Sequence, residues 1–274
     1  MAPIGVFDSG IGGLSVLRHL QAQLPAEHFV YLADQGHVPY GSRSAEEIIQ
    51  FSQGITQFFQ RQLNAKAIVI ACNTASAAAL SLLREQFDVP FVGMEPAVKP
   101  AARQTQSGKV GILATGGTFA SERYARLTAK HAQGVTVWED PCIGLVPEIE
   151  AGRLDSPAVH HILQQALAPM LAAGVDTVVL GCTHYPFVLS VVEGIVGTAV
   201  TIIDPAPAVA RQTGVVLRQH NLLAERDQPG SVRFITTGLA EPCARQVEQL
   251  LGLEDTVVET AVWAGDRLSV IRNR

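Results

Sequence analysis

Runs of apolar residues alternate along the chain with longer stretches that have helical periodicity. Residues 12–24 place four leucines on one face of a helix: Leu14, Leu17, Leu20 and Leu24. The apolar runs are continuous, which is typical of strands buried on both faces of a parallel sheet. The pattern therefore predicts an α/β fold, with helices at 12–24 and 45–64 and strands at 3–8, 28–34 and 67–73.

The same pattern restarts in the middle of the chain. The segment "VGILATGGT" (110–118) is similar to "IGVFDSGIGG" (4–13), and "DTVVLGCTHYP" (176–186) is similar to "AIVIACNTA" (67–75). In each pair an apolar strand is followed by small and polar residues, and the two pairs are separated by nearly the same offset. We interpret this as an internal duplication that gives two similar parallel-sheet α/β domains.

The last part of the chain follows the duplicated region and is short for a core of its own. Its pattern predicts two helices and two strands, at 207–220, 232–238, 241–251 and 256–263. We expect these elements to complete the first sheet. The first domain is then discontinuous, with residues 1–96 plus 208–274, and the second comprises 97–207, with the active site in the cleft between them.

Charge and cysteine content narrow the function classes. The 274 residues carry a formal net charge of −5 and no run of Lys or Arg, so there is no basic footprint for nucleic acid. The N-terminus lacks the pattern of a signal peptide, and the longest apolar runs are too short for a bilayer. Four cysteines without a CxxC pair do not make a disulfide framework. We expect a cytoplasmic protein with reduced thiols and no membrane partner.

Polar residues cluster where the predicted strands end. Ligands bind at the carboxyl ends of parallel strands, and the polar residues found there are Asp8, Ser9, Tyr40, Gly41, Cys72, Asn73, Thr74, Thr115 to Thr118, Cys182, Thr183 and His184. Each has a plain structural interpretation, because glycine-rich turns need tight geometry and a cysteine at a strand end is commonly a small buried hydrophobe. The symmetric placement of Cys72 and Cys182 favours a site. Cys142 and Cys243 lack such a context, and we interpret them as structural.

Three kinds of chemistry are candidates for two opposed thiols. A redox disulfide needs sulfurs in bonding contact, usually close in sequence. A zinc site needs further ligands, and no Cys/His cluster at ligand spacing accompanies these thiols. The third is a pair of acid/base groups on opposite faces of one carbon, one removing a proton and the other returning it. In this third scheme His184 is expected to tune one thiol and Asp8 the other.

Six motifs in register resemble the bacterial glutamate racemases of the cofactor-independent aspartate/glutamate racemase superfamily. They are "GVFDSGIGGLSVLR", "YLAD…VPYGSRS", "IVIACNTASA", "GILATGGTFASERY", "LVPEIEAG" and "VVLGCTHYPFV". The resemblance runs from about residue 4 to 205. It implies two α/β domains, a cleft between them, and a two-base mechanism that needs no cofactor and no metal. It also implies that the enzyme is commonly a homodimer.

The resemblance also implies roles for individual residues. Cys72 would deprotonate D-glutamate with help from Asp8, and Cys182 would deprotonate L-glutamate with help from His184. Glu150, in "EIEAG", matches a further glutamate near the site. The residues that would hold the substrate are Asp8, Ser9, Tyr40, Gly41, Asn73, Thr74, Thr118, Thr183 and His184. The stretch Gln35-Gly36-His37 departs from the family pattern, and we expect it not to touch the core chemistry.

The expected activity is interconversion of L- and D-glutamate, which supplies the D-isomer for peptidoglycan. One alternative is the same reaction on aspartate. A second is a thiol-dependent amidase or hydrolase with Cys182 as nucleophile and His184 as base. That pairing is disfavoured if both residues continue a strand, where neighbours point to opposite faces. A third is a two-lobed amino-acid binding protein, in which two thiols would have no purpose.

Overall fold

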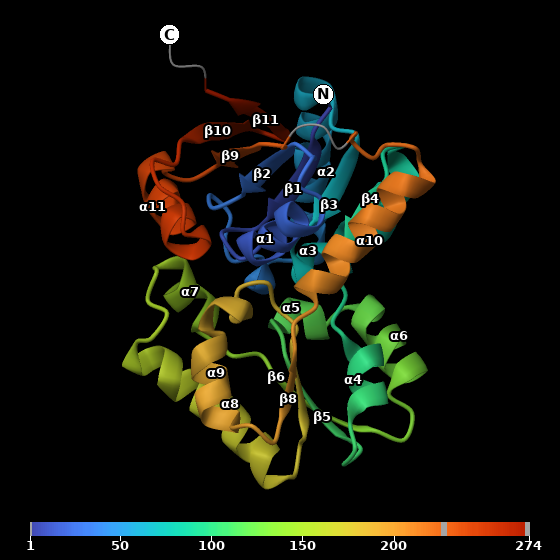
Figure 1. Ribbon diagram of the computed structural model, residues 1–274, viewed down its shortest axis with the longest axis vertical. Coiled ribbons are helices and arrows are strands. Elements are labelled where there is room, and N and C mark those ends of the chain that lie inside the picture. The colour runs from blue at the N-terminus through green and yellow to red at the C-terminus, as the bar shows by residue number, and fades with distance from the viewer. Residues whose placement is uncertain (1, 226–228, 272–274) are drawn as a thin grey trace.

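The computed structural model describes residues 2–225 and 229–271 and consists of two lobes, each built on its own sheet (Figure 1). One sheet has seven strands in the order β11-β10-β9-β2-β1-β3-β4, and the other has four in the order β6-β5-β7-β8. All strand pairs are parallel except that of β10 with β11. The predicted α/β class with two parallel sheets is therefore confirmed.

The first sheet takes strands from both ends of the chain. Its amino-terminal strands are β1 (Ile4–Asp8), β2 (Phe29–Ala33), β3 (Ala67–Ile70) and β4 (Phe91–Gly93). The tail adds β9 (Val232–Thr236), β10 (Val258–Ala264) and β11 (Arg267–Val270) on the far side of β2. The expectation that the tail completes the first sheet is confirmed. The antiparallel strand β11 was not predicted, because it is short and only one of its residues is buried.

Helices cover both faces of this sheet. On one face α1 (Leu14–Gln23) packs against α10 (Ala206–Gln219), with α11 (Ala240–Leu251) beside them; on the other lie α2 (Ala45–Leu63) and α3 (Asn73–Gln86). Strand residues alternate between the two layers: Ile4 and Val6 join the core under α1, and Phe7 joins the core under α2. Burial on both faces explains why the strands read as continuous apolar runs.

The second sheet repeats the topology of the first. It contains β5 (Lys109–Leu113), β6 (Thr136–Asp140), β7 (Thr177–Leu180) and β8 (Thr201–Ile203), and its order is that of β2-β1-β3-β4. One flank carries α4 (Val98–Gln104) and α6 (Glu122–His131); the other carries α7 (Leu145–Glu150), α8 (Pro157–Ala172) and α9 (Leu189–Val196). The repeated order supports the interpretation of an internal duplication.

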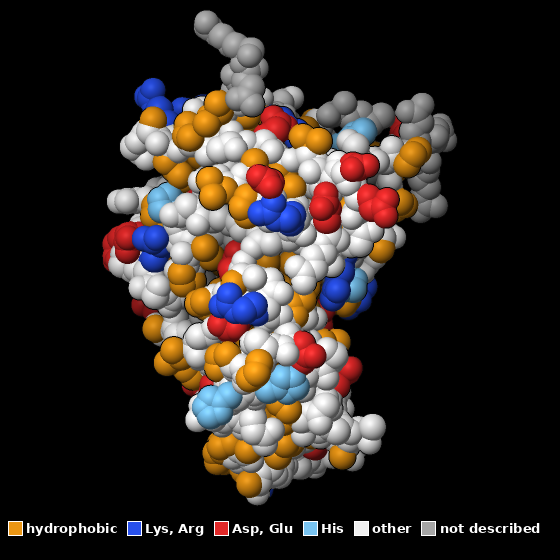
Figure 2. Space-filling view, turned by 90° about the vertical axis from the view of Figure 1, so that its left-hand side faces the viewer, with side chains coloured by type: hydrophobic (Ala, Val, Ile, Leu, Met, Phe, Trp, Pro, Cys, Tyr) orange, Lys and Arg blue, Asp and Glu red, His pale blue; other side chains and the backbone are white. Residues whose placement is uncertain are grey.

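The chain passes between the lobes twice, between β4 and α4 and again between β8 and α10 (Figure 1). Short elements at the junction are α5 (Gly116–Phe119) and the 3₁₀ turns η1 (Tyr40–Ser42) and η2 (Tyr185–Val188). On the face in Figure 2, basic and acidic side chains are interspersed and do not form one basic patch. Within residues 2–225 and 229–271, no helix is long and apolar enough to cross a membrane.

Candidate active site

A small cavity lies where the carboxyl ends of the two sheets meet. Residues of the first lobe that line it are Ser9, Pro39, Tyr40, Gly41, Cys72, Asn73 and Thr74, and those of the second are Thr115, Val146, Cys182, Thr183 and His184. Its volume of ≈ 20 Å³ is enough for about one water molecule. The lobes are thus closed around the two thiols, and an amino acid requires them to separate.

Each thiol is placed just beyond the end of a central strand. Cys72 has extended backbone after β3 and is the N-cap residue of α3, where its Sγ accepts a hydrogen bond from the Ala75 amide at 3.5 Å. Cys182 holds the corresponding place after β7. Because β1–β3 and β5–β7 are equivalent pairs in the two sheets, the thiols approach the cavity from opposite lobes.

Asn73 is the clearest sign of a missing polar partner. Its side chain is buried, and neither Oδ1 nor Nδ2 has a hydrogen-bond partner among the described residues. Buried amides in native proteins are nearly always paired, so an unpaired one that lines a cavity points to a polar ligand. Its position beside Cys72 at the N-terminus of α3 suits a carboxylate.

Asp8, at the end of β1, is fully buried behind Cys72. Its Oδ2 accepts from the Gly10 amide at 3.0 Å, and its Oδ1 accepts from Thr183 Oγ1 of the other lobe at 3.3 Å. Burial raises the pKa of the Asp8 carboxyl, although the nearby His184 and the Gly10 amide oppose this. Burial and the charge of Asp8 together raise the pKa of the Cys72 thiol well above its ordinary value. Cys72 therefore rests as a thiol.

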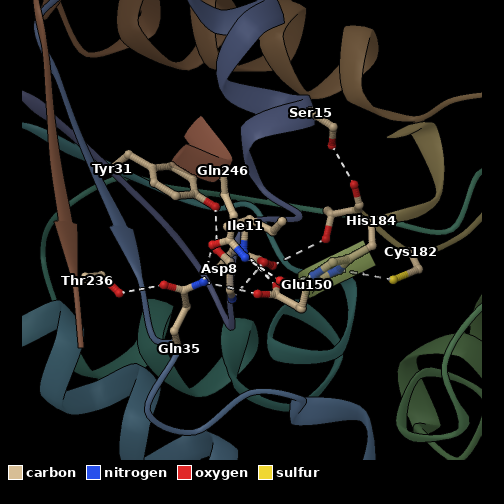
Figure 3. Close-up of polar contacts among 12 residues, drawn as sticks. Asp8, Ile11, Ser15, Tyr31, Gln35, Glu150, Cys182, His184, Thr236 and Gln246 are labelled. Carbon is tan, nitrogen blue, oxygen red and sulfur yellow. Dashed lines mark hydrogen bonds and ion pairs between the residues drawn. The ribbon is translucent and has the colours of Figure 1, made fainter. Parts of the chain in front are cut away.

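His184 connects the second thiol to a buried carboxylate (Figure 3). Its Nδ1 lies 3.7 Å from Cys182 Sγ, and its Nε2 lies 2.6 Å from Glu150 Oε1. Burial opposes protonation of the ring, but Cys182 and Glu150 outweigh it and raise the pKa of His184 well above its ordinary value. Burial also opposes ionisation of Glu150, yet hydrogen bonding to His184 leaves the pKa of that carboxyl lowered. The pair is an imidazolium and a carboxylate.

The glycine-rich turn after β1 leaves room for this pair. A Cβ on Gly10 would overlap the carboxylate of Glu150, and one on Gly12 would overlap the His184 ring and lie 2.7 Å from Thr183 Oγ1. The turn also donates its Ile11 amide to Glu150 Oε1 at 2.8 Å. The glycines therefore permit close approach of the second lobe.

Tyr40 is held by a carboxylate that the sequence analysis did not select. Its hydroxyl donates to Asp34 Oδ2 at 2.6 Å, and Asp34 Oδ1 accepts from Thr237 Oγ1 at 2.7 Å and from Trp263 Nε1 at 2.9 Å. These bonds and one to His37 outweigh burial and lower the pKa of Asp34. Asp34 could have been selected from the sequence, because it ends the predicted strand in "YLAD" and polar residues at strand ends were the basis for choosing the other site residues.

Most residues selected from the sequence lie in the cavity wall, and three lie behind it. Asp8 and Glu150 contact Thr183 and His184 from behind. Thr118 is fully buried and reaches the cavity through Thr115, whose Oγ1 is 3.2 Å from Thr118 Oγ1 and 2.8 Å from Thr74 Oγ1.

Two expectations from the sequence were wrong. His184 does contact Cys182: the two residues are two apart, so strand alternation would not separate them, and both lie beyond β7 in a turn. Gln35 does reach the site region, because its Nε2 lies 3.2 Å from Glu150 Oε2. The expected structural role of Cys142 and Cys243 fits their buried positions away from the cavity wall. Among the residues that the structure describes, no group of three or more His, Cys, Asp or Glu is placed to hold a metal ion.

Comparison with known proteins identifies the family. The sequence profile of the Asp/Glu/Hydantoin racemase family matches residues 4–213. The chain belongs to this family. It is 49% identical to a glutamate racemase of Pseudomonas paraeruginosa over 257 residues, which cover 93% of this chain and 96% of the relative.

Solved structures show the same two-lobed fold. Glutamate racemase isoform RacE1 of Bacillus anthracis has a TM-score of 0.86 at 34% identity, with 97% of this chain and 98% of that chain covered. The Escherichia coli glutamate racemase in complex with L-glutamate and the activator UDP-MurNAc-Ala has a TM-score of 0.82 at 31% identity, with 99% and 100% covered.

We expect Gly12→Ala to reduce kcat/KM by about 10²-fold, because the new methyl group displaces His184 and Thr183, and shifts of about 1 Å have such effects. Gly194→Ala is the control, since nothing lies within 4 Å of its Cβ position. Steady-state kinetics on both variants checks this. Equal activities of the two variants would contradict the close approach of His184 and Thr183 to Gly12.

We expect Glu150→Gln to lower the free energy of unfolding by about 2 kcal/mol, the scale of a buried charged hydrogen bond. Glu150 has a lowered pKa, so its contribution is present above about 4.5 and lost as the pH falls through the folded value. His184 has a raised pKa, so its contribution is present below 6.5 and lost as the pH rises through its folded value. The free energies of unfolding of the unsubstituted chain and of Glu150→Gln, measured with urea at several pH values, should therefore differ most between about pH 4.5 and pH 6.5.

The matched control is Glu122→Gln, whose exposed carboxylate pairs with the exposed Arg126 on α6. Its unfolding should differ little from that of the unsubstituted chain. A pH-independent loss in Glu150→Gln would contradict a buried ion pair.

Proposed function

We propose that this chain interconverts L- and D-glutamate by two-base proton transfer, with Cys72 and Cys182 on opposite faces of the α-carbon. The observation that carries this is the pair of buried thiols in one cavity, each contributed by the same place in one of two repeated sheets. Cys182 would take the α-proton of L-glutamate while Cys72 delivers a proton to the other face. With D-glutamate the roles reverse, and the enzyme ends each turnover with its protons exchanged between the thiols.

The two sides of the site are electrostatically unequal. Cys72 has an anionic neighbour in Asp8, which raises the pKa of its thiol, and Cys182 has a cationic neighbour in His184, whose Nδ1 lies 3.7 Å from Sγ. This distribution of charge supports the proposed roles, in which Cys182 is the base toward L-glutamate. For D-glutamate, Cys72 must lose its proton, and the buried Asp8 with its raised pKa is the nearest group that can accept one.

Charge that develops on the substrate needs oriented donors, because a thiolate is a weak base for an α-proton. Asn73, whose side-chain amide is unpaired among the described residues, lines the cavity together with Ser9 and Thr74, and Asn73 and Thr74 begin α3. In a closed, dry site each such donor is worth about 3 kcal/mol of transition-state stabilisation. The small cavity supports this arrangement, since closing the lobes would expel water from around the substrate.

The names of the relatives favour glutamate over aspartate. The matching proteins in the pseudomonads are glutamate racemases, and the Escherichia coli structure contains L-glutamate. The contact of Cys182 with His184 is also the geometry of a hydrolase nucleophile and base. The second thiol on the opposite wall has no role in that reaction, which favours racemisation.

We assign residues 1–96 with 208–274 to one domain and 97–207 to the other, because the two crossings lie at β4–α4 and β8–α10. We extend the proposal to a homodimer in which each protomer carries its own site. A cytoplasmic location suits four cysteines that are all free thiols.

We expect Cys72→Ser and Cys182→Ser each to abolish most racemisation without unfolding the chain, because serine is isosteric but far less acidic. Circular dichroism of L-glutamate, and separately of D-glutamate, measures the reaction with no added cofactor. Both signals of the unsubstituted protein should decay to the same racemic endpoint while L-aspartate stays unchanged. Cys142→Ser is the control. A cysteine variant that kept most of its activity would contradict the two-base scheme.

A further inference from the structure

Glu150 belongs to the second lobe, but the groups that hold its carboxylate, apart from His184, come from the first. The Ile11 amide donates to Oε1, and Gln35 Nε2 donates to Oε2 at 3.2 Å. Gln246 of α11 donates its amide to the backbone carbonyl of Glu150. Figure 3 shows Gln35 and Gln246 converging on Glu150 from the side opposite His184.

The orientation of the Gln35 amide is fixed by its other partners. Its Oε1 accepts from Thr236 Oγ1 at 2.9 Å, so its NH₂ group faces Glu150. The same NH₂ group donates to Gln246 Oε1 at 2.9 Å, which turns the Gln246 NH₂ group toward the Glu150 backbone. The amides therefore form a directed chain from β9 to Glu150, in which each hydrogen bond runs from an O–H or N–H to an oxygen.

We propose that Gln35, braced by Gln246, is a positioning residue that aligns Glu150 with His184 when the lobes close, and so readies Cys182 for L-glutamate. Gln35 touches neither thiol and acts through Glu150 and His184. The inference rests on the proposed function and adds a residue to it. The Cys72 side differs, because Asp8 already takes the Gly10 amide from its own turn.

The groups around Glu150 explain why a neutral donor is suited to this position. His184 faces the carboxylate as a cation, and Asp8, Tyr31 and Cys243 face it as groups that are neutral or anionic. Glu150 raises the pKa of Asp8, and burial opposes the ionisation of Glu150 itself, whereas His184, the Ile11 amide and Gln35 lower the pKa of Glu150 and so favour its ionised form. Gln35 supplies a hydrogen-bond donor without adding charge, and a carboxylate at position 35 would repel Glu150.

The experiment compares Gln35→Leu, Gln35→Glu and Gln246→Leu with Gln249→Leu. Gln249 is the matched control, because it also reaches from α11 to the second lobe. Its side-chain amide bonds only the Gly152 carbonyl, at 3.4 Å, among the residues that the structure describes. The equilibrium constant of a racemase is one, so kcat/KM must fall equally for both enantiomers. The asymmetry is therefore read from primary isotope effects on kcat/KM with α-deuterated L- and D-glutamate.

For Gln35→Leu we expect kcat/KM to fall about tenfold, the scale of one hydrogen bond to a charged group. The isotope effect should grow with L-glutamate and shrink with D-glutamate, because proton transfer at Cys182 becomes the slower step. The acidic limb of the pH profile should move to higher pH, since Glu150 loses a donor, and it should move further in Gln35→Glu. Gln246→Leu should change kcat/KM, the isotope effects and the pH profile in the same directions but by smaller amounts. Gln249→Leu should match the unsubstituted enzyme.

Isotope effects that change equally for the two enantiomers, or an unmoved pH profile, would overturn the proposal, as would Gln249→Leu behaving like Gln35→Leu. If Gln35→Leu does not fold by circular dichroism, Gln246→Leu decides by the same readouts. Absence of racemisation in the unsubstituted protein would instead refute the proposed function, so the two failures are distinguishable.

Discussion

The buried ion pair of His184 and Glu150 is the interaction on which the site depends. It joins the end of α7 to the turn after β7, and both partners press against the glycine-rich turn of the other lobe. A charge removed from water is tolerated only when its partners are in place. Here the partners include groups from both lobes, so the energetics of the pair are tied to the closed arrangement. Opening the cleft for substrate must weaken the contacts that keep the imidazolium beside Cys182.

The tail of the chain supports both halves of this arrangement. Through Thr237 and Trp263 it fixes Asp34, which holds Tyr40 at the cavity wall. Through Thr236 and Gln246 it fixes the neighbouring Gln35, which holds Glu150. Asp34 and Gln35, which directly follow β2, thus connect the tail to two separate parts of the site, Tyr40 and Glu150. This gives the added strands a function that a repeated pair of four-stranded units would lack.

Many of the strands and most residues of the cavity wall could be predicted from the sequence. The strands β1, β2, β3 and β7 were predictable because they are buried on both faces and read as continuous apolar runs, whereas β4 and β8 have three residues each and the edge strand β6 is largely exposed. The cavity residues at the strand ends were predictable because parallel topology gathers them. Gln35 and Gln246 were not, since they contact Glu150 across 115 and 96 residues of sequence. An amide in a loop or on a helix carries no sign of which carboxylate it will meet.

The unequal environments of the two thiols follow from the duplication itself. Repeated sheets present the same strand end twice, which supplies two equivalent cysteines, but the proposed two-base scheme needs one of them to hold a proton while the other does not. The two halves therefore have to diverge in what surrounds each sulfur. Asp8 in the first half and the Glu150-stabilised imidazolium in the second place opposite charges beside the two thiols. In the two-base scheme that we propose, the symmetric scaffold sets the geometry of proton transfer, and the unequal neighbours distinguish the two sulfurs.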